Sequence, residues 1–370
     1  MRNMPPLWMR EAVLFLLILT GMACAIYLLV CPAPLTRIPH CQLSRSVDFN
    51  GKALMKALLV TPQYKPGLFP NITNALLSTR VYAPSPNPKD IFRAKFFDPR
   101  MTVAQRGLLT KYLNLVADIM RTNNLEDKWF LSGGTLLGSL RHHDLIPWDD
   151  DADVLVDIKY RGLIQRAIES RRSEGFHVHK SGYRDKVYIS ILPSTMNDVD
   201  VEGTRQIPGR DYGWPFLDIC YYKIEGGILH ELESYNLQHY SYLVEDVFPL
   251  IYRPFGEMWV PTPKRAVKVL VEMYPRSVDC IYNGFSHLAE WRQRRAIAAC
   301  DQLAIKYAFV RRCPIKDTKV DEEYNFVPIV EQLVSRSIDG SYKIIYEIPT
   351  IVHSTEVHSH FDPLILDWTV

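Results

Sequence analysis

The chain has 370 residues, of which 47% are hydrophobic and 23% are charged, and its formal net charge at pH 7 is +2. This composition supplies apolar material for one large domain or two smaller ones, and it excludes an intrinsically disordered protein. Because the net charge is close to zero, it does not indicate a polybasic nucleic-acid-binding surface, and we expect no nucleic-acid partner.

Residues 12–31 form an uncharged, mostly apolar run near the start of the chain. A helix of this length spans about 30 Å, the thickness of the hydrocarbon core of a membrane. A cleaved signal peptide is the alternative, but its apolar region is usually only about 7–15 residues long. We therefore predict a single N-terminal membrane helix, an uncleaved signal anchor that follows a cytoplasmic tail at residues 1–11.

The orientation of this anchor follows from weaker signals. Arginines lie on both sides of the apolar run, so the distribution of positive charge is nearly balanced. Asn71 begins the only N-glycosylation sequon of the chain, which is usable only if the body of the protein is lumenal. We predict a single-pass type II protein of the Golgi or ER membrane with a lumenal catalytic domain.

Residues 32–100 contain ten prolines, a composition typical of a stem between an anchor and a folded body. We expect short ordered pieces of this stem, such as residues 52–60, to pack on the body.

The predicted lumenal part contains an odd number of cysteines: Cys41, Cys220, Cys280, Cys300 and Cys313. We expect one or two disulfides among the last three. At least one cysteine is then left over, so a disulfide-linked or a non-covalent oligomer stays open.

The predicted catalytic body, residues 101–310, opens with a capping box at Thr102 and Gln105, followed by apolar residues at helical spacing. The apolar patterns then alternate between strand and helix periods along the chain. We predict strands at 129–131, 153–156, 176–180, 186–192, 216–222, 343–348 and 351–353, and helices at 136–140, 160–172, 263–273 and 287–309. This order predicts an α/β (α+β) fold with a small central mixed sheet flanked by helices, followed by a C-terminal extension at residues 311–370.

Four carboxylates crowd into five positions between apolar residues, at Asp149, Asp150, Asp151 and Asp153. Residues two apart on a strand share a face, so Asp151 and Asp153 point the same way. Two such charges repel each other, and a divalent cation between them removes the repulsion. Because all ligands are oxygens, we predict Mg²⁺ or Mn²⁺. Asp149 has the same parity and is a candidate base or metal support, whereas Asp150 is expected to face elsewhere.

The acidic run has three other interpretations. An EF-hand loop is excluded, because it needs Gly and Glu where this chain has Val154 and Tyr160. A solvated acidic loop remains the simplest structural interpretation. The Asp-x-Asp motif of a glycosyltransferase that uses a UDP- or GDP-sugar also suits a type II secretory protein.

Gly133 and Gly134 separate a predicted strand from a predicted helix. Glycines let a phosphate approach the backbone, and a helix N-terminus offers free N–H groups, although a plain turn has the same pattern. Thr135 completes this turn. Arg141 and His142 follow as cations that could hold a phosphate opposite the metal.

Asp218 stands alone in an apolar predicted strand. A charge in such a place is costly unless it is paired or bound to a metal. A salt bridge to a buried Arg or Lys is one explanation. Beside an Asp-x-Asp pair, we interpret Asp218 as a third metal ligand, and Lys186 as a further candidate phosphate contact.

The stretch GGTLLGSLRHHDLIPWDDDADV, with WPFLDI and FGEMWVPTPKRAVKVLVEMYP downstream, resembles the signature blocks of the LicD/fukutin family of nucleotidyltransferase-fold phosphotransferases, over about residues 125–275. The resemblance implies a glycine turn, an Asp-x-Asp pair and a third acidic residue on a neighbouring strand. These roles fall on Gly133 and Gly134 with Thr135, on Asp151 and Asp153, and on Asp218. Tyr274-Pro275 departs from the usual Tyr-Gly of the family, and we expect this departure to lie away from the metal site.

The same resemblance implies an activity. Family members take a phospho-alcohol, such as phosphocholine or ribitol phosphate, from a CDP-activated donor and place it on a glycan. The expected co-substrates are therefore a CDP-alcohol and a glycan carried by a glycoprotein or glycolipid. A non-catalytic lumenal scaffold is the alternative from another class of protein.

Overall fold

The computed structural model describes residues 51–61, 72–233, 239–275, 279–315 and 318–357. The predicted cytoplasmic tail and signal anchor, and the sequon asparagine Asn71, lie outside these ranges. Within them, no helix combines the length and the apolar character needed to cross a membrane.

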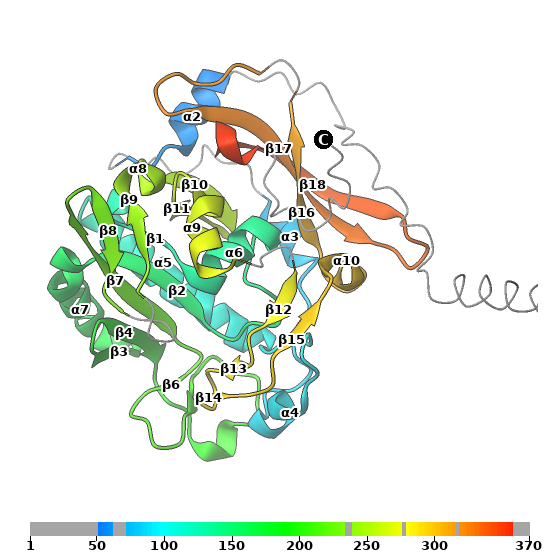
Figure 1. The fold of residues 1–370 in the computed structure, drawn as a ribbon. Helices are drawn as coiled ribbons and strands as arrows, with labels where there is room; N and C mark the ends of the chain where they lie inside the picture. Colours follow the sequence, from blue (N-terminus) through cyan, green and yellow to red (C-terminus); the bar gives the residue numbers. More distant parts are fainter. Residues whose placement is uncertain (1–50, 62–71, 234–238, 276–278, 316–317, 358–370) are drawn as a thin grey trace, which may run out of the picture. The chain divides into compact units, whose positions relative to one another are not determined.

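A mixed sheet forms the centre of the fold (Figure 1). Its strands lie in the order β1-β2-β7-β4-β3, and β8 and β9 extend the sheet from β7. Strands β2 and β7 are parallel, whereas the other neighbours are antiparallel. The predicted mixed α/β class is confirmed. The strands are β1 (Trp129–Leu131), β2 (Ala152–Asp157), β3 (Phe176–Ser181), β4 (Arg184–Ile189), β7 (Leu217–Glu225), β8 (Ile228–Glu231) and β9 (Ser241–Leu243).

The pairing of β2 with β7 positions the acidic residues. Both strands are rich in β-branched, aliphatic and aromatic residues and are buried on both faces over most of their length, as expected for parallel neighbours in the middle of a sheet. Their register places Asp153 beside Asp218. Two aspartates far apart in the sequence therefore lie side by side.

Helices α5 (Val103–Thr122) and α7 (Arg161–Glu169) contact each other; α5 also contacts β4 and β7, and α7 contacts β3. The predicted capping box is present: the Thr102 side chain accepts from the backbone N–H of Gln105, and the Gln105 side chain accepts from that of Thr102. Helix α6 (Gly133–His142) contacts β2, β10, β16 and α9 (Ala266–Met273). It begins three residues earlier than predicted, so the two glycines form its first turn.

Part of the proline-rich segment is ordered against the body. Leu59 forms a bridge with Ile251 of β10, and Leu58 and Leu76 are buried. An ordered piece at residues 52–60 is therefore confirmed. The short helices of this segment are α2 (Gly51–Leu58), α3 (Thr73–Leu77) and α4 (Pro88–Arg93).

A second, antiparallel sheet follows, with the order β16 (Phe309–Pro314), β17 (Phe326–Arg336) and β18 (Tyr342–His353). The two strands predicted at 343–348 and 351–353 are one continuous strand. Glu331 of β17 lies 2.9 Å from His143, the residue that ends α6. The predicted boundary at residue 310 falls inside β16.

The helix predicted at residues 287–309 is wrong. The region instead contains short strands that pair as β12 with β15 and β13 with β14, and one turn of helix, α10. A disulfide between Cys280 and Cys300 closes this segment, as predicted for these cysteines, and Glu290 has φ +54°, which a helix does not allow. The elements are β12 (Cys280–Tyr282), β13 (Phe285–Ser286), β14 (Trp291–Arg292), β15 (Ala296–Ala298) and α10 (Cys300–Leu303).

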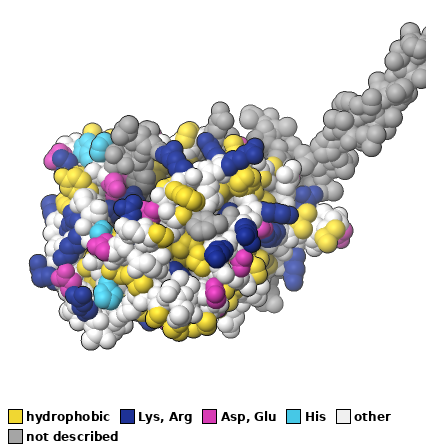
Figure 2. Space-filling model, turned by 90° about the horizontal axis from the view of Figure 1, so that it is seen from below, with side chains coloured by type: hydrophobic (Ala, Val, Ile, Leu, Met, Phe, Trp, Pro, Cys, Tyr) yellow, Lys and Arg dark blue, Asp and Glu magenta, His cyan; other side chains and the backbone are white. Residues whose placement is uncertain are grey.

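The remaining described elements connect these parts. They are β5 (Arg205–Gln206), β6 (Gly213–Trp214), α8 (Val244–Val247), β10 (Ile251–Phe255) and β11 (Met258–Thr262), with 3-10 turns at Glu126–Lys128, Ile158–Tyr160, Arg172–Glu174, Ser194–Met196 and Ser354–Glu356. On the face shown in Figure 2, Lys and Arg side chains are interspersed with acidic and hydrophobic ones.

Candidate functional site

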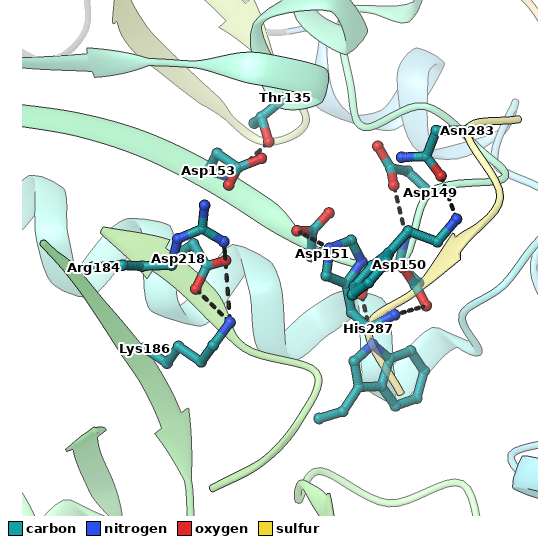
Figure 3. Close-up of polar contacts among 12 residues, drawn as sticks. Thr135, Asp149, Asp150, Asp151, Asp153, Arg184, Lys186, Asp218, Asn283 and His287 are labelled. Carbon is teal, nitrogen blue, oxygen red and sulfur yellow. Dashed lines mark hydrogen bonds and ion pairs between the residues drawn. The ribbon is translucent and has the colours of Figure 1, made fainter. Parts of the chain in front are cut away.

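Three carboxylates come together where β2 and β7 run side by side. Asp151 directly precedes β2, Asp153 lies in β2 and Asp218 lies in β7, and each offers an oxygen within 4.8 Å of the others. Asp151 and Asp218 are buried, and Asp153 is only partly exposed. Figure 3 shows the three side chains around a common space. The structure thus brings together the three residues predicted to bind a metal.

The electrostatics of Asp153 fit a cation at this place. Burial raises the pKa of Asp153 well above its ordinary value, and the carboxylates of Asp151 and Asp218 raise it further. Within the described part of the chain, its side chain accepts no hydrogen bond; only its backbone N–H donates, to Oγ1 of Thr135 at 2.7 Å. A set of three carboxylate oxygens is the donor chemistry of Mg²⁺ and Mn²⁺. These residues therefore fit the predicted cation.

Asp218 also forms salt bridges with basic residues, which is the alternative to its interpretation as a metal ligand. Lys186 Nζ lies 2.9 Å from its Oδ1, and Arg184 Nη1 lies 2.8 Å from its Oδ2. Lys186 packs over the ring of Phe216, 3.6 Å from the ring centre. The predicted phosphate contact Lys186 is therefore at the carboxylate cluster, with Asp218 as its present partner.

The glycine turn lies directly against the carboxylates. A Cβ on Gly134 would lie 2.7 Å from Oδ2 of Asp149, and one on Gly133 would lie 3.2 Å from Oδ2 of Asp153. Gly133 also has φ +55°. Burial and the carboxylate of Asp151 raise the pKa of Asp149 to about 8. The glycines therefore let the N-terminus of α6 meet the acidic residues closely.

Arg141 and His142 do not lie at the predicted phosphate position. Both are buried at the opposite end of α6, where Arg141 Nη2 donates to the carbonyl of Asp279 at 3.0 Å and His142 Nδ1 donates to that of Ala308 at 2.8 Å. His142 lines a cavity of about 50 Å³. Burial, with the neighbouring charges of Arg141 and His143, lowers the pKa of His142 to about 3. The prediction that these two side chains would hold a phosphate is corrected: their contacts are structural.

His287 joins the site and was missed in the sequence. Its Nδ1 lies 2.6 Å from Oδ1 of Asp150, and its Nε2 lies 2.9 Å from Oδ2 of Asp151 (Figure 3). Burial lowers the pKa of His287, but the carboxylates of Asp151 and Asp150 outweigh burial and raise it well above the ordinary value. Asp150, expected to face elsewhere, therefore faces this histidine. The sequence pattern of this segment predicts a helix, so no local signal marks His287 as a site residue.

The position of Tyr274 also differs from the prediction. Burial, and then the carboxylates of Asp153, Asp149 and Asp151, raise the pKa of Tyr274 well above its ordinary value. Its hydroxyl lies 3.7 Å from the position of a Cβ on Gly133. Tyr274, the first residue of the Tyr274-Pro275 pair, is therefore beside the acidic cluster, although the pair was expected to lie away from the metal site.

Comparison with known proteins identifies the domain that carries this cluster. Residues 126–265 match the family described as LicD/FKTN/FKRP, nucleotidyltransferase domain. The match includes α6, β2 and β7, and so contains all three clustered aspartates. His287 and Tyr274 lie beyond it.

An uncharacterised protein of Rickettsia typhi is similar to part of the chain. The two are 23% identical over 145 residues, which is 39% of this chain and 42% of the relative. The chain thus spans less than half the length of this relative.

Proposed function

The chain belongs to the LicD/fukutin family through its domain at residues 126–265, and we propose that it is a metal-dependent phosphotransferase of the secretory pathway. It moves a phospho-alcohol, such as phosphocholine or ribitol phosphate, from a CDP-activated donor to a glycan hydroxyl. The family match supports a transferase that acts on sugars or phospho-alcohols, and the carboxylate cluster beside the N-terminus of α6 supports the use of a metal and of a donor that contains phosphate.

One observation carries the proposal. Asp151, Asp153 and Asp218 present their carboxylate oxygens to one another within 4.8 Å, beside the N-terminus of α6. A divalent cation bound by these three residues would offset the negative charge on both phosphates of the donor. The first N–H groups of a helix have no partner within that helix, so α6 offers donors for phosphate oxygens at Gly133, Gly134 and Thr135.

The reaction is a displacement at the β-phosphorus. The oxygen of the acceptor hydroxyl forms a bond to this phosphorus, the bond from the phosphorus to the bridging oxygen breaks, and CMP leaves with the electron pair. Asp149 accepts the proton of the hydroxyl, because burial and the neighbouring Asp151 raise its pKa to about 8, close to neutral pH. Lys186 and Arg184 supply positive charge on the side of Asp218.

Location and partners belong to the same proposal. The Cys280–Cys300 disulfide is typical of an oxidising compartment. It supports a lumenal body, held by the predicted anchor in the Golgi or ER membrane as a type II protein. The acceptor is then a glycan on a glycoprotein or glycolipid in that lumen.

A donor panel tests the proposal. The purified full chain with Mn²⁺ is incubated with CDP-choline, CDP-ribitol, UDP-sugars and GDP-sugars, and its thermal unfolding is followed, with Asp151→Asn/Asp153→Asn as the control. Stabilisation by CDP-alcohols alone, absent in the control, is expected. Stabilisation by a UDP- or GDP-sugar would support the glycosyltransferase alternative, and no response to metal or nucleotide would support a scaffold.

A further inference from the structure

We infer that His287 is a positioning residue that fixes the carboxylate of Asp151 for cation binding. The inference rests on the proposed metal site, but His287 itself comes from a segment outside the matched domain. Asp151 is the residue that the two acidic groups of the site share: one group contains Asp153 and Asp218, and the other contains Asp149, Asp150 and His287.

The contacts of the imidazole fully determine its orientation. Nε2 lies 2.9 Å from Oδ2 of Asp151, and Nδ1 lies 2.6 Å from Oδ1 of Asp150. The backbone N–H of His287 also donates to Oδ2 of Asp150, at 3.1 Å. Because each ring nitrogen lies within hydrogen-bonding distance of a carboxylate oxygen, the ring is held between Asp150 and Asp151.

Further contacts fix Asp150 and the imidazole of His287. The carbonyl of Asp150 accepts from Trp214 Nε1 at 2.6 Å, and the N–H of Asp150 donates to Oδ1 of Asp149 at 3.1 Å. The rings of Phe216 and Phe285 pack edge-on against the imidazole, with centres 5.9 Å and 4.8 Å away. Asp150 therefore orients His287, and His287 orients Asp151.

The segment that carries His287 is tied down on both sides. The disulfide joins its ends at Cys280 and Cys300. Trp148 Nε1 donates to the carbonyl of Ile281 at 3.0 Å, which links the segment to the loop before β2. The segment 280–300 therefore places the imidazole of His287 at a site whose other residues lie mainly in the matched domain.

The expected consequence is a change in metal affinity. Residues that orient a metal ligand through a hydrogen bond typically contribute about 10–100-fold to affinity. Without the imidazole, the carboxylate of Asp151 loses the contact at Oδ2 that fixes its orientation relative to the other two ligands. We therefore expect His287→Ala to raise the Kd for Mn²⁺ by about 10–100-fold, with the number of bound ions unchanged.

Binding of Mn²⁺ to the full chain, followed by the electron paramagnetic resonance signal of the free ion, tests the inference. His287→Gln keeps one amide donor, so it is expected to recover part of the affinity and serves if His287→Ala fails to fold. His230→Ala is the matched control, since His230 of β8 pairs with Ser241 of β9. Thermal unfolding in chelator checks that the fold is intact.

The outcomes separate the inference from the proposed function. Wild-type affinity in His287→Ala would overturn the inference alone, and so would tighter binding, because it would show that the imidazole acts on the cation through its charge and not by orienting Asp151. Loss of a whole equivalent of Mn²⁺ would identify His287 as a ligand and overturn its positioning role. If the wild-type chain bound no Mn²⁺, the metal assignment would fail, and the inference with it.

Discussion

The ammonium of Lys186 lies 2.9 Å from Oδ1 of Asp218, directly across the ladder between β4 and β7. The sequence allows two interpretations of Asp218, a salt bridge or a metal ligand. In the structure Asp218 forms salt bridges and also belongs to the carboxylate cluster. Arg184 adds a second cation at 2.8 Å. The protein thus brings positive charge to one side of a carboxylate cluster whose members otherwise repel each other.

Replacing Lys186 with Met should tighten Mn²⁺ binding while weakening donor binding. Methionine retains an unbranched apolar side chain over the ring of Phe216, but removes a charge that repels a bound cation. Because Lys186 contacts a carboxylate proposed to bind the cation, the loss of its positive charge is expected to lower the Kd for Mn²⁺ by about tenfold. Lys180→Met is the control, because Lys180 pairs with Glu169 on the surface. Weaker Mn²⁺ binding in Lys186→Met would show that the lysine instead holds Asp218 in place.

Two glycines of α6 should respond differently to alanine. A Cβ at Gly134 meets only the side chain of Asp149, whereas one at Gly138 would lie 2.5 Å from the backbone carbonyl of Asp144. Gly134→Ala should therefore lower transfer activity with little loss of Tm, since alanine favours the helix by about 1 kcal/mol. Gly138→Ala should lower Tm. Equal losses of Tm in both variants would contradict this assignment.

Metal binding should become tighter as the pH rises from about 5 to about 8. The pKa of Asp149 is raised from 3.8 to about 8, and that of Asp153 is also raised. In the metal-free chain, these groups contribute stability below pH 3.8, and that contribution is lost as the pH rises through their folded pKa values. Mn²⁺ must displace the bound protons, so its effect on Tm should be larger at pH 8 than at pH 5.

Thermal unfolding with Mn²⁺ or chelator at each pH measures this linkage. Asp149→Asn removes one titrating group and should flatten the pH dependence of the Tm in chelator. A metal-induced shift in Tm that is the same at both pH values would contradict the raised pKa values.

Glu331→Gln should destabilise the fold by about 3–5 kcal/mol. Glu331 is fully buried and accepts from Arg253, Arg312 and His143. Burial raises the pKa of Glu331, but Arg253, His143 and Arg312 together lower it far below its ordinary value. Without the carboxylate, the buried guanidinium groups of Arg253 and Arg312 each lose an ion pair. Denaturant unfolding measures the loss.

The control is Glu225→Gln, because Glu225 forms an exposed ion pair with Lys223. This substitution should lower the free energy of unfolding by less than about 1 kcal/mol. An equal loss in Glu331→Gln and Glu225→Gln would contradict a special role for the buried carboxylate.

The sequence predicted the residues of the carboxylate cluster because local rules determine them. Strand parity selects Asp151 and Asp153, and the isolation of Asp218 between apolar residues marks it as a charge that needs a partner. It also predicted the capping box of α5 and five of the seven strands of the central sheet, but not β8 and β9. In each case the determining information lies within a few neighbouring residues.

The errors concern positions fixed by distant contacts. Arg141 and His142 follow the glycine turn closely in sequence, but α6 carries them to its other end, where the carbonyls of Asp279 and Ala308 bind them. His287 reaches the site only because the segment 280–300 is folded into hairpins and closed by a disulfide. Helical periodicity in a single sequence does not show which face a tertiary neighbour will cover.

Transfer of a radiolabelled phospho-alcohol tests the central claim most directly. The full chain is incubated with labelled CDP-choline or CDP-ribitol, a glycan acceptor and Mg²⁺ or Mn²⁺, beside Asp151→Asn/Asp153→Asn, which keeps the side-chain volumes. The account predicts transfer by the wild-type chain and a fall of at least about a thousandfold in the variant, since a bound metal contributes several kcal/mol to such a step. Full activity in the variant would contradict the account.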